Sequence, residues 1–501
     1  MILDSRDIAR DSALAADLCI IGAGAAGISL ALELAGGPHE ILVLEGGGPA
    51  YDQRSQELYD GPEAGLLIPP GSRYLASTRL RYFGGTTNHW NGFCRPLDRE
   101  DFEPREWVAR SGWPISLADL EPFYARACEL LQISPFDYDQ ATAGAHRRLL
   151  DGDEVFETNF FHISPPTRFA QAYRRPLEES AKIRVVTNAN VRRIEVDSDA
   201  RHAVGLDVVR PDGSPLAVTA RHYVLATGGI ENARVLLNSD RVRENGLGND
   251  YDLVGRCFME HLAQRIGVVV IPNGRRQVPK TYSKSRVRSR NNWICGAIRP
   301  RAEAQRERRL LNSLLMVTPL AQSEVADLAP AVERLARDLR ELAALPPIDT
   351  RPGYFGWLHA YGEQQPDLDS RVSLSDERDR LGARRSALDW RVDEVESRSM
   401  RTTARLFIER LGMNLDARGW LLPPDRPWGA ARWSNHHMGT TRMSADPASG
   451  VVDPECRLHG VDNVFVAGSS VFATSGSSNP TLTLVALAVR LGHHLKGVLA
   501  S

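Results

Sequence analysis

The sequence predicts an α/β protein in which a Rossmann-like domain is joined to a second, α+β domain built on a mostly antiparallel sheet. Two observations support this prediction. Over residues 17–45, an apolar strand, a glycine-rich turn, an alanine-rich helix and a second apolar strand follow one another, which is the order of elements in a βαβ unit. Over residues 263–429, strand-like runs return as YFGWLHAYGEQQ and SRVSLS. A chain of 501 residues has the length of two domains.

The composition is that of an ordinary folded protein, with 42% hydrophobic and 25% charged residues. The net charge of -2 gives no general attraction to nucleic acid or to a membrane surface. The six cysteines have no CxxC, haem or zinc spacing, which indicates free thiols in a reducing compartment. The first residues lack the pattern of an export signal, and no stretch reaches the ~20 apolar residues of a membrane span. We therefore expect a cytoplasmic protein with no integral membrane segment.

The first glycine-rich turn is a candidate site for the phosphates of a dinucleotide. Gly22, Gly24 and Gly27 form a GxGxxG pattern between the strand and the helix, where glycine permits a tight turn, approach of a pyrophosphate and close packing of the helix. The N-terminus of that helix offers free N–H groups to phosphate oxygens. Glu45 ends the second strand, where a carboxylate accepts hydrogen bonds from the adenosine ribose. The pattern predicts dinucleotide binding without choosing between NAD and FAD.

A second concentration of unusual residues is RYFGGTTNHWNGFCRPLD at residues 81–98. It has no amphipathic period and is predicted to be a loop. We expect it to lie along a cofactor through Gly84, Gly85 and Asn88, with His89 near the reactive ring. The alternative is a glycine turn whose Trp90 fills a core.

Further segments complete the expected domain plan. Residues 99–165 are predicted to be helical and to cover the first domain. Strands return from residue 183, and the strand that ends near Ala226 runs into a glycine turn at Gly228 and then a helix. Because a second strand-glycine-helix step is typical of flavoproteins, we expect Val191, Ala226 and Gly228 to contact the cofactor. The predicted cofactor-binding domain is discontinuous (1–98, 166–262 and 430–501), and the substrate-binding domain comprises 99–165 and 263–429.

Two features of the second domain bear on partners. The basic segment at residues 274–290 is predicted to be a solvated loop or lid, because it has too few interleaved aromatics for a nucleic-acid site. Leucine and valine recur at helical spacing over residues 328–342, which predicts a helix packed on the core. A helix that binds a partner or a membrane surface is the alternative. We expect no nucleic-acid partner.

The last part of the chain has the components of an active site. Residues 433–484 begin with WSNHHMGTTRM, continue through a strand that ends at Ala467 and Gly468, and reach an Asn479-Pro480 step that opens an apolar helix. Asparagine followed by proline suits a helix start, since the side chain caps the helix and proline fits its first position. The polar cluster with two adjacent histidines is the candidate centre of the chemistry.

Together these motifs resemble the glucose-methanol-choline (GMC) family of FAD-dependent oxidoreductases. The resemblance covers nearly the whole chain through GAGAAG with Glu45, GGTTNHW, ATGGIENARVLL, VGRCFMEHL, EQQPDLDSRVSLSDERDRLG, HHMGTTRM, and NVFVAGSSVF with SSNPTLT. It implies the GMC fold, with a FAD-binding domain like that of p-hydroxybenzoate hydroxylase, and FAD as the cofactor. GGTTNHW and SSNPTLT are most similar to the branch of pyranose oxidase and the bacterial sugar dehydrogenases.

The resemblance also implies roles for the C-terminal residues. The family's histidine base stands three residues before the glycine of a GT pair, which is His436 here, with His437 as the competitor. A neutral histidine can take the hydroxyl proton of an alcohol while the carbon's hydride goes to flavin N5. Asn479 corresponds to the family's partner of that base and is expected to orient the hydroxyl. The residues expected to lie against FAD in this stretch are Gly468, Ser469, Pro480 and Thr481.

The activity that the resemblance implies is oxidation of a secondary hydroxyl of a sugar, glycoside or similar polyol to a ketone, with oxygen, a quinone or another carrier as electron acceptor. One alternative is oxidation of a primary alcohol to an aldehyde, for example on an aminoglycoside. Others are a lyase that uses FAD structurally, the catalytic subunit of an electron-transfer complex, and an NAD-dependent dehydrogenase. FAD is expected to be noncovalent; a covalent link at His89 is the alternative, because His89 precedes Trp90 as does the flavin-bearing histidine of pyranose oxidase.

Overall fold

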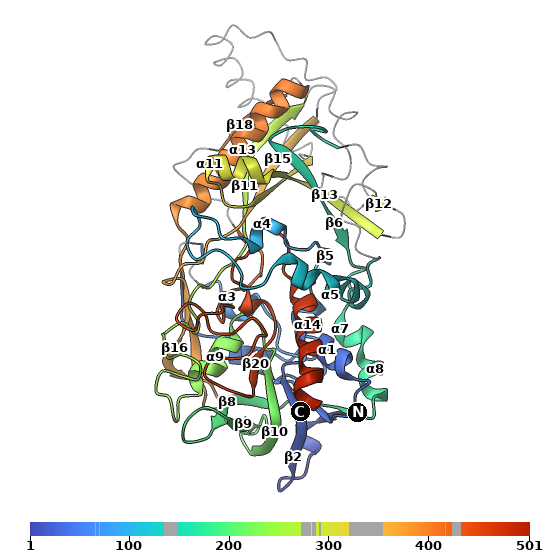
Figure 1. Cartoon of the computed structure of the whole chain (residues 1–501), viewed down its shortest axis with the longest axis vertical. Coiled ribbons are helices and arrows are strands. Elements are labelled where there is room, and N and C mark those ends of the chain that lie inside the picture. The colour runs from blue at the N-terminus through green and yellow to red at the C-terminus, as the bar shows by residue number, and fades with distance from the viewer. Residues whose placement is uncertain are drawn as a thin grey trace.

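The computed structural model describes residues 1–65, 67–69, 71–134, 148–271, 282, 287–289, 292–319, 354–415, 417–422 and 432–500. Two large sheets lie one above the other along the long axis of the molecule, and both termini lie in the lower part (Figure 1). The lower sheet is mostly parallel and the upper sheet is antiparallel, which confirms the predicted fold class. The predicted basic loop lies mostly, and the predicted leucine-rich helix entirely, outside the described residues.

The lower sheet has a parallel centre. Its order is β1-β7-β3-β2-β10-β9-β8, with β20 beside β10, and β9 runs antiparallel to both of its neighbours, β10 and β8. Every residue of β3 is buried, as expected for a strand inside a parallel sheet. The strands are β1 Ile2–Asp4, β2 Ala13–Ile21, β3 Ile41–Leu44, β7 Ile183–Thr187, β8 Asn190–Val196, β9 Ala203–Val209, β10 Pro215–Leu225 and β20 Val464–Val466.

The carboxyl ends of the central parallel strands bring the glycine turns together. The backbone N–H of Gly22 donates to the carbonyl of Leu44, and the N–H of Ala467 donates to the carbonyl of Leu225, each at 2.7 Å. The first turn, the end of β3, the second turn and the end of β20 therefore share one edge of the sheet, which is where α/β proteins bind their ligands.

Three helices pack together beside this sheet: α1 Ala25–Leu34, α5 Leu117–Leu130 and α14 Thr481–Ala500. Among the described residues, α14 is the one helix long and apolar enough to cross a membrane by length and composition. Its apolar window is 61% buried inside the protein, as is usual for a core helix. The other α-helices of the described residues are α2 Gln53–Gln56, α3 Tyr74–Ser77, α4 Arg99–Phe102, α7 Phe169–Ala172, α8 Arg174–Glu179, α9 Glu231–Asn238, α11 Ala302–Arg308 and α13 Glu394–Leu415.

The upper sheet has the order β18-β11-β15-β14-β13-β6-β5, with β12 beside β13 and β19 beside β11. The long helix α13 packs against β11, β14, β15 and β18 (Figure 1). The strands are β5 Phe93–Cys94, β6 Phe156–Ile163, β11 Leu262–Ile271, β12 Val287–Ser289, β13 Asn292–Pro300, β14 Ser313–Pro319, β15 Tyr354–Gly362, β18 Arg418–Leu421 and β19 Arg432–Trp433.

A third, small sheet crosses the predicted domain division. It consists of β4 Glu63–Gly65, β16 Arg371–Arg378 and β17 Arg384–Trp390, and β4 pairs in parallel with β17. Strand β5 also belongs to the upper sheet, although it precedes the predicted boundary at residue 98. The two parts of the chain are thus joined by strand pairing as well as by their connecting segments.

The prediction that residues 99–165 are helical is wrong for their last part. Helices α4 and α5 lie in this segment, but Phe156–Ile163 forms β6 and pairs along its whole length with β13. The sequence FETNFFHI has the aromatic and β-branched residues that suit a sheet. Its partner strand lies far along the chain, so local pattern alone did not identify it.

Candidate active site

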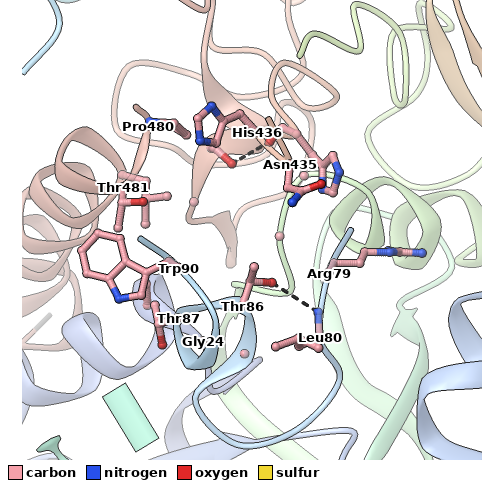
Figure 2. A pocket seen from close by; sticks show the side chains of 18 of the residues that line it. Gly24, Arg79, Leu80, Thr86, Thr87, Trp90, Asn435, His436, Pro480 and Thr481 are labelled. Atoms are coloured by element: carbon pink, nitrogen blue, oxygen red, sulfur yellow. Dashed lines mark hydrogen bonds between the residues drawn. The ribbon is translucent and has the colours of Figure 1, made fainter. Parts of the chain in front are cut away.

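A cavity of about 650 Å³ runs from the glycine turns of the lower sheet to the strands of the upper sheet. Figure 2 shows Thr86 and Trp90 of one chain segment, and His436 and Pro480 of another, around the same space. Most of the predicted site residues line this cavity: Gly22, Gly24, Glu45, Gly85, His89, Val191, Ala226, Gly228, His436, Gly468, Ser469, Asn479, Pro480 and Thr481.

The first glycine turn is packed too tightly for side chains at two of its positions. A Cβ on Gly22, whose φ is +110°, would lie 2.5 Å from the carbonyl oxygen of Ala226, and a Cβ on Gly27 would lie 1.9 Å from the carbonyl oxygen of Gly22. Glu45 holds the turn, because its carboxylate accepts hydrogen bonds from the N–H groups of Ala23 (3.0 Å) and Gly47 (2.8 Å). Glu45 also lines the cavity.

Three residues that were predicted to bind the cofactor, Gly27, Gly84 and Asn88, do not line the cavity. Gly27 is enclosed by the turn. The N–H of Gly84 donates to the carbonyl of Ala23 at 2.8 Å and so ties the two glycine segments together. Asn88 donates through Nδ2 to the carbonyl of Phe83 at 2.9 Å. These residues shape the backbone that the cofactor would meet.

The two residues expected to carry the chemistry lie side by side. Nε2 of His436 is 3.1 Å from Nδ2 of Asn479, and both residues line the cavity. On the other edge of the imidazole, Nδ1 of His436 is 2.9 Å from Nδ1 of His261. Burial, followed by His261 and His437 nearby, lowers the pKa of His436 well below its ordinary value of 6.5. The ring is therefore neutral at physiological pH.

A buried carboxylate fixes the backbone around this histidine. Glu260 accepts hydrogen bonds from the N–H of His436 (2.7 Å), the N–H of His261 (2.9 Å) and the hydroxyl of Tyr74 (2.9 Å). Burial raises the pKa of Glu260 to about 7, and these donors oppose that shift by stabilising the ionised form. Through these hydrogen bonds, Glu260 holds the backbone of His261 and the backbone of His436 next to each other.

His437 has different surroundings. Its ring stacks on Phe258, with ring centres 5.9 Å apart, and lies edge-on to Tyr74 at 5.6 Å. Burial, followed by the charge of Arg79, lowers the pKa of His437 to about 3. It lines the cavity, but Asn479 bonds to His436 and not to His437.

The upper sheet contributes an apolar wall to the cavity. Phe93, Phe161, Leu314, Met316 and Tyr361 line this part of the cavity, and they belong to one hydrophobic cluster. Such walls are usual for small-molecule sites, where a few polar groups fix the orientation of the ligand.

The acidic side chains that line the cavity are committed to other partners. In the described part of the chain they are Glu45, bonded to the glycine turn, and Glu231. Glu231 is buried between Arg79 at 3.0 Å and Arg234 at 3.3 Å. Among the described residues, Glu231 is the one acidic side chain of the cavity lining outside the glycine turn, and it is already paired with two arginines.

The sequence reasoning did not assign a role to four residues of this site. Glu260 and His261 occur in VGRCFMEHL, which served only to support the resemblance. Tyr74 and Arg79 lie between motifs, and no local signal marks them. The adjacent Glu260 and His261 in VGRCFMEHL were the one feature of the sequence that could have indicated these residues as part of the site.

The residues present fit FAD. Gly24, Gly228 and Gly468 come from three separate segments and line the cavity. A Cβ on Gly24 or Gly228 would meet no protein atom within 4 Å, and one on Gly468 would meet only the Cβ of Ala26 at 3.9 Å. These bare backbone positions, with the N-terminus of α1 and the carboxylate of Glu45, suit an extended dinucleotide.

Comparison with known proteins agrees with this geometry. Residues 17–243 match the model described as FAD dependent oxidoreductase, and residues 366–488 match the model described as GMC oxidoreductase. The chain belongs to the GMC family of FAD-dependent oxidoreductases. As expected of that family, it is an FAD enzyme that oxidises CH–OH groups.

Relatives of similar length span almost the whole chain. The fructose dehydrogenase large subunit of Gluconobacter japonicus is 24% identical over 95% of this chain and 97% of its own. The 6'''-hydroxyparomomycin C oxidase of Streptomyces lividus is 25% identical over 97% and 92%. In the solved structure of pyridoxine 4-oxidase from Mesorbium loti, the same fold covers 96% of this chain and 99% of that one, with a TM-score of 0.60 and 17% identity.

The lowered pKa of His436 predicts how activity depends on pH. A neutral imidazole takes a proton and a protonated one does not, so activity should be lost only when pH falls through the lowered pKa. The rate of flavin reduction at low substrate concentration should therefore stay level through pH 6.5 and fall only at a pH well below it. A descending limb near pH 7 would contradict this expectation and would indicate that ionised Glu260 is required.

Proposed function

We propose that this enzyme oxidises a secondary hydroxyl of a neutral sugar or glycoside to a ketone. The observation that carries the proposal is the pair formed by Nε2 of His436 and Nδ2 of Asn479, which lie 3.1 Å apart in the cavity. An acceptor and a donor at this separation suit a single hydroxyl group. Asn479 donates to the hydroxyl oxygen, and His436 accepts the hydroxyl proton.

FAD, when bound, takes up the hydrogen on the carbinol carbon together with two electrons, which completes the balance of an alcohol becoming a ketone. The protein's own residues hold the alcohol and remove its proton. The positive end of α14, which begins at Thr481 directly after Asn479-Pro480, favours negative charge developing at this point. An external carrier or oxygen then has to accept the two electrons.

The cavity favours a neutral substrate over a polycationic one. Glu45 is expected to face the adenosine ribose of FAD, and Glu231 is already paired with Arg79 and Arg234. Neither acidic residue of the described cavity lining would then neutralise the ammonium groups of an aminoglycoside. Unpaired charge in a desolvated site is unfavourable. The apolar wall that includes Phe161 and Tyr361 instead suits the C–H faces of a pyranose ring or an apolar aglycone. The Streptomyces relative is named for an aminoglycoside, so this alternative needs a direct test.

The test is anaerobic bleaching of the flavin by a matched panel of compounds. Methyl β-D-glucopyranoside and an aryl glucoside represent neutral glycosides, paromomycin represents the cationic class, and deoxy derivatives of the methyl glycoside identify the hydroxyl that reacts. We expect bleaching by the neutral glycosides, a ketone as product by mass spectrometry and NMR, and no bleaching by paromomycin. Bleaching by paromomycin alone, or an aldehyde as the product, would overturn the proposal. Readmitting air then separates an oxidase from a dehydrogenase.

We propose noncovalent FAD, with His89 beside the cofactor. His89 lines the cavity at the end of the GGTTN turn, which supports a position beside the cofactor and does not require a bond. Acid precipitation should leave a colourless pellet and release all of the yellow FAD, in the wild type and in His89→Ala alike. A yellow wild-type pellet with a colourless His89→Ala pellet would show that a covalent link exists.

A further inference from the structure

His261 lines the cavity beside His436, and the two rings are nearly perpendicular at 89°. It is 4% exposed, and burial lowers its pKa, which keeps the ring neutral. A neutral imidazole carries one N–H and one bare nitrogen, and the hydrogen bond made by one nitrogen determines which is which.

The first step concerns the far edge of the His261 ring. Its Nε2 lies 3.2 Å from the carbonyl oxygen of Ser475. A carbonyl oxygen only accepts hydrogen bonds. Nε2 of His261 therefore carries the proton, and Nδ1 of the same ring has a free lone pair.

The second step passes from His261 to the catalytic ring. Nδ1 of His436 is 2.9 Å from Nδ1 of His261, and since the latter is an acceptor, Nδ1 of His436 must donate. Nε2 of His436 is then the bare nitrogen. The amide of Asn479 agrees with this assignment, because the donor Nδ2 faces that nitrogen at 3.1 Å.

We infer that His261 is a positioning residue that holds His436 in the tautomer with its proton on Nδ1, so that the lone pair of Nε2 faces the reacting hydroxyl. The inference rests on the proposed role of His436 as the base. If His436 carried its proton on Nε2 instead, that atom would have no lone pair with which to accept a proton. The three donors to Glu260 hold both backbones in place, so the ring contact is maintained.

Two substitutions of His261 separate this role from simple packing. In His261→Asn, the side-chain oxygen can occupy the position of Nδ1 and still accept from His436. In His261→Gln, the amide can reach the position of Nε2 and still bond to Ser475, but a methylene group replaces the acceptor that faces His436. Of the two variants, His261→Gln has the larger side chain, and it loses the hydrogen-bond acceptor that faces Nδ1 of His436.

The direct measurement is ¹⁵N NMR of the holoenzyme labelled in its 13 histidines, with the His436 signals identified by their absence in His436→Asn. We expect His436 in the Nδ1–H form in the wild type and in His261→Asn, and a population of the Nε2–H form in His261→Gln. The second measurement is flavin reduction by the panel sugar that reduces the wild type fastest. His261→Gln should lower kcat about 100-fold with KM little changed, and His261→Asn should recover most of the loss.

An Nε2–H tautomer of His436 in the wild type would overturn the inference, as would equal rates for His261→Gln and the wild type, or equal losses in the Asn and Gln variants. Should His261→Gln fail to fold, the wild-type spectrum and His261→Asn still decide the question. Failure of every panel sugar to bleach the flavin, with the Nδ1–H form present, would refute the proposed substrate class but not the tautomer.

Discussion

Replacing His436 with alanine should lower the rate of substrate-dependent flavin reduction about a thousand-fold while FAD remains bound. The substitution removes the one imidazole nitrogen that bonds to Asn479 in the cavity. The glycine turns and Glu45, which are expected to hold the dinucleotide, lie on the lower sheet and are unchanged. Stopped-flow reduction under anaerobic conditions gives the rate, and the flavin absorption spectrum gives the occupancy.

The matched comparison is His437→Ala, with His494→Ala as a control on the exposed side of α14. His437 packs against Phe258 and Tyr74 and does not bond to Asn479, so its loss should be the smaller one. His494→Ala should behave as the wild type. Near wild-type reduction by His436→Ala together with a large loss in His437→Ala would show that the base is misassigned.

Replacing Gly24 with alanine should weaken FAD binding about 100-fold, which corresponds to about 2.8 kcal/mol at 1.4 kcal/mol per factor of ten. Gly24 immediately precedes α1, and an added Cβ would meet no protein atom within 4 Å. Because Gly24 lines the cavity, the added methyl group would occupy the space through which the pyrophosphate approaches the helix N-terminus. Titration of the apoprotein with FAD, followed by flavin fluorescence, measures the change.

Two other glycines distinguish a cofactor contact from a folding requirement. Gly36 also has no atom within 4 Å of an added Cβ, but it lies outside the cavity beyond the end of α1, so Gly36→Ala should bind FAD as the wild type does. Gly27→Ala would place a Cβ 1.9 Å from the carbonyl of Gly22 and should reduce the melting temperature of the apoprotein itself. Equal melting temperatures for all three variants, or unchanged FAD affinity in Gly24→Ala, would contradict this division.

The cofactor half of the site was largely predictable because its signals are local. A buried apolar strand followed by glycine places that glycine at the carboxyl edge of a parallel sheet, and Gly22, Ala226 and Gly468 all line the cavity there. Glu45 is at the end of β3 for the same reason. The pattern did not distinguish glycines that face the cavity from those that pack inside the turn, and Gly27 and Gly84, which were expected to contact FAD, lie outside the cavity lining.

The catalytic half of the site could be predicted only in part, because some of its residues lie in recognisable motifs and others come from a distant segment of the chain. The family resemblance at HHMGTTRM and SSNPTLT implied the roles of His436 and Asn479, and folding places their side chains 3.1 Å apart. The partner on the other side of the ring, His261, is 175 residues away along the chain. No periodicity or spacing encodes a contact of that range. It arises because the end of the Cys257–His261 segment pairs with the segment at Met438, through the bridge between Met259 and Met438.

Local patterns in the chain therefore predicted the fold class and dinucleotide binding, since each depends on residues close together in the sequence. The family resemblance, carried by motifs spread over nearly the whole chain, implied FAD and the base His436. The tertiary structure decided which residue bonds to each ring nitrogen of His436. It also showed that Glu231 is already paired with an arginine and that residues 156–163 form a strand. Each of these depends on a hydrogen bond, an ion pair or a strand partner supplied by a distant segment, and such partners are defined only when the chain is packed.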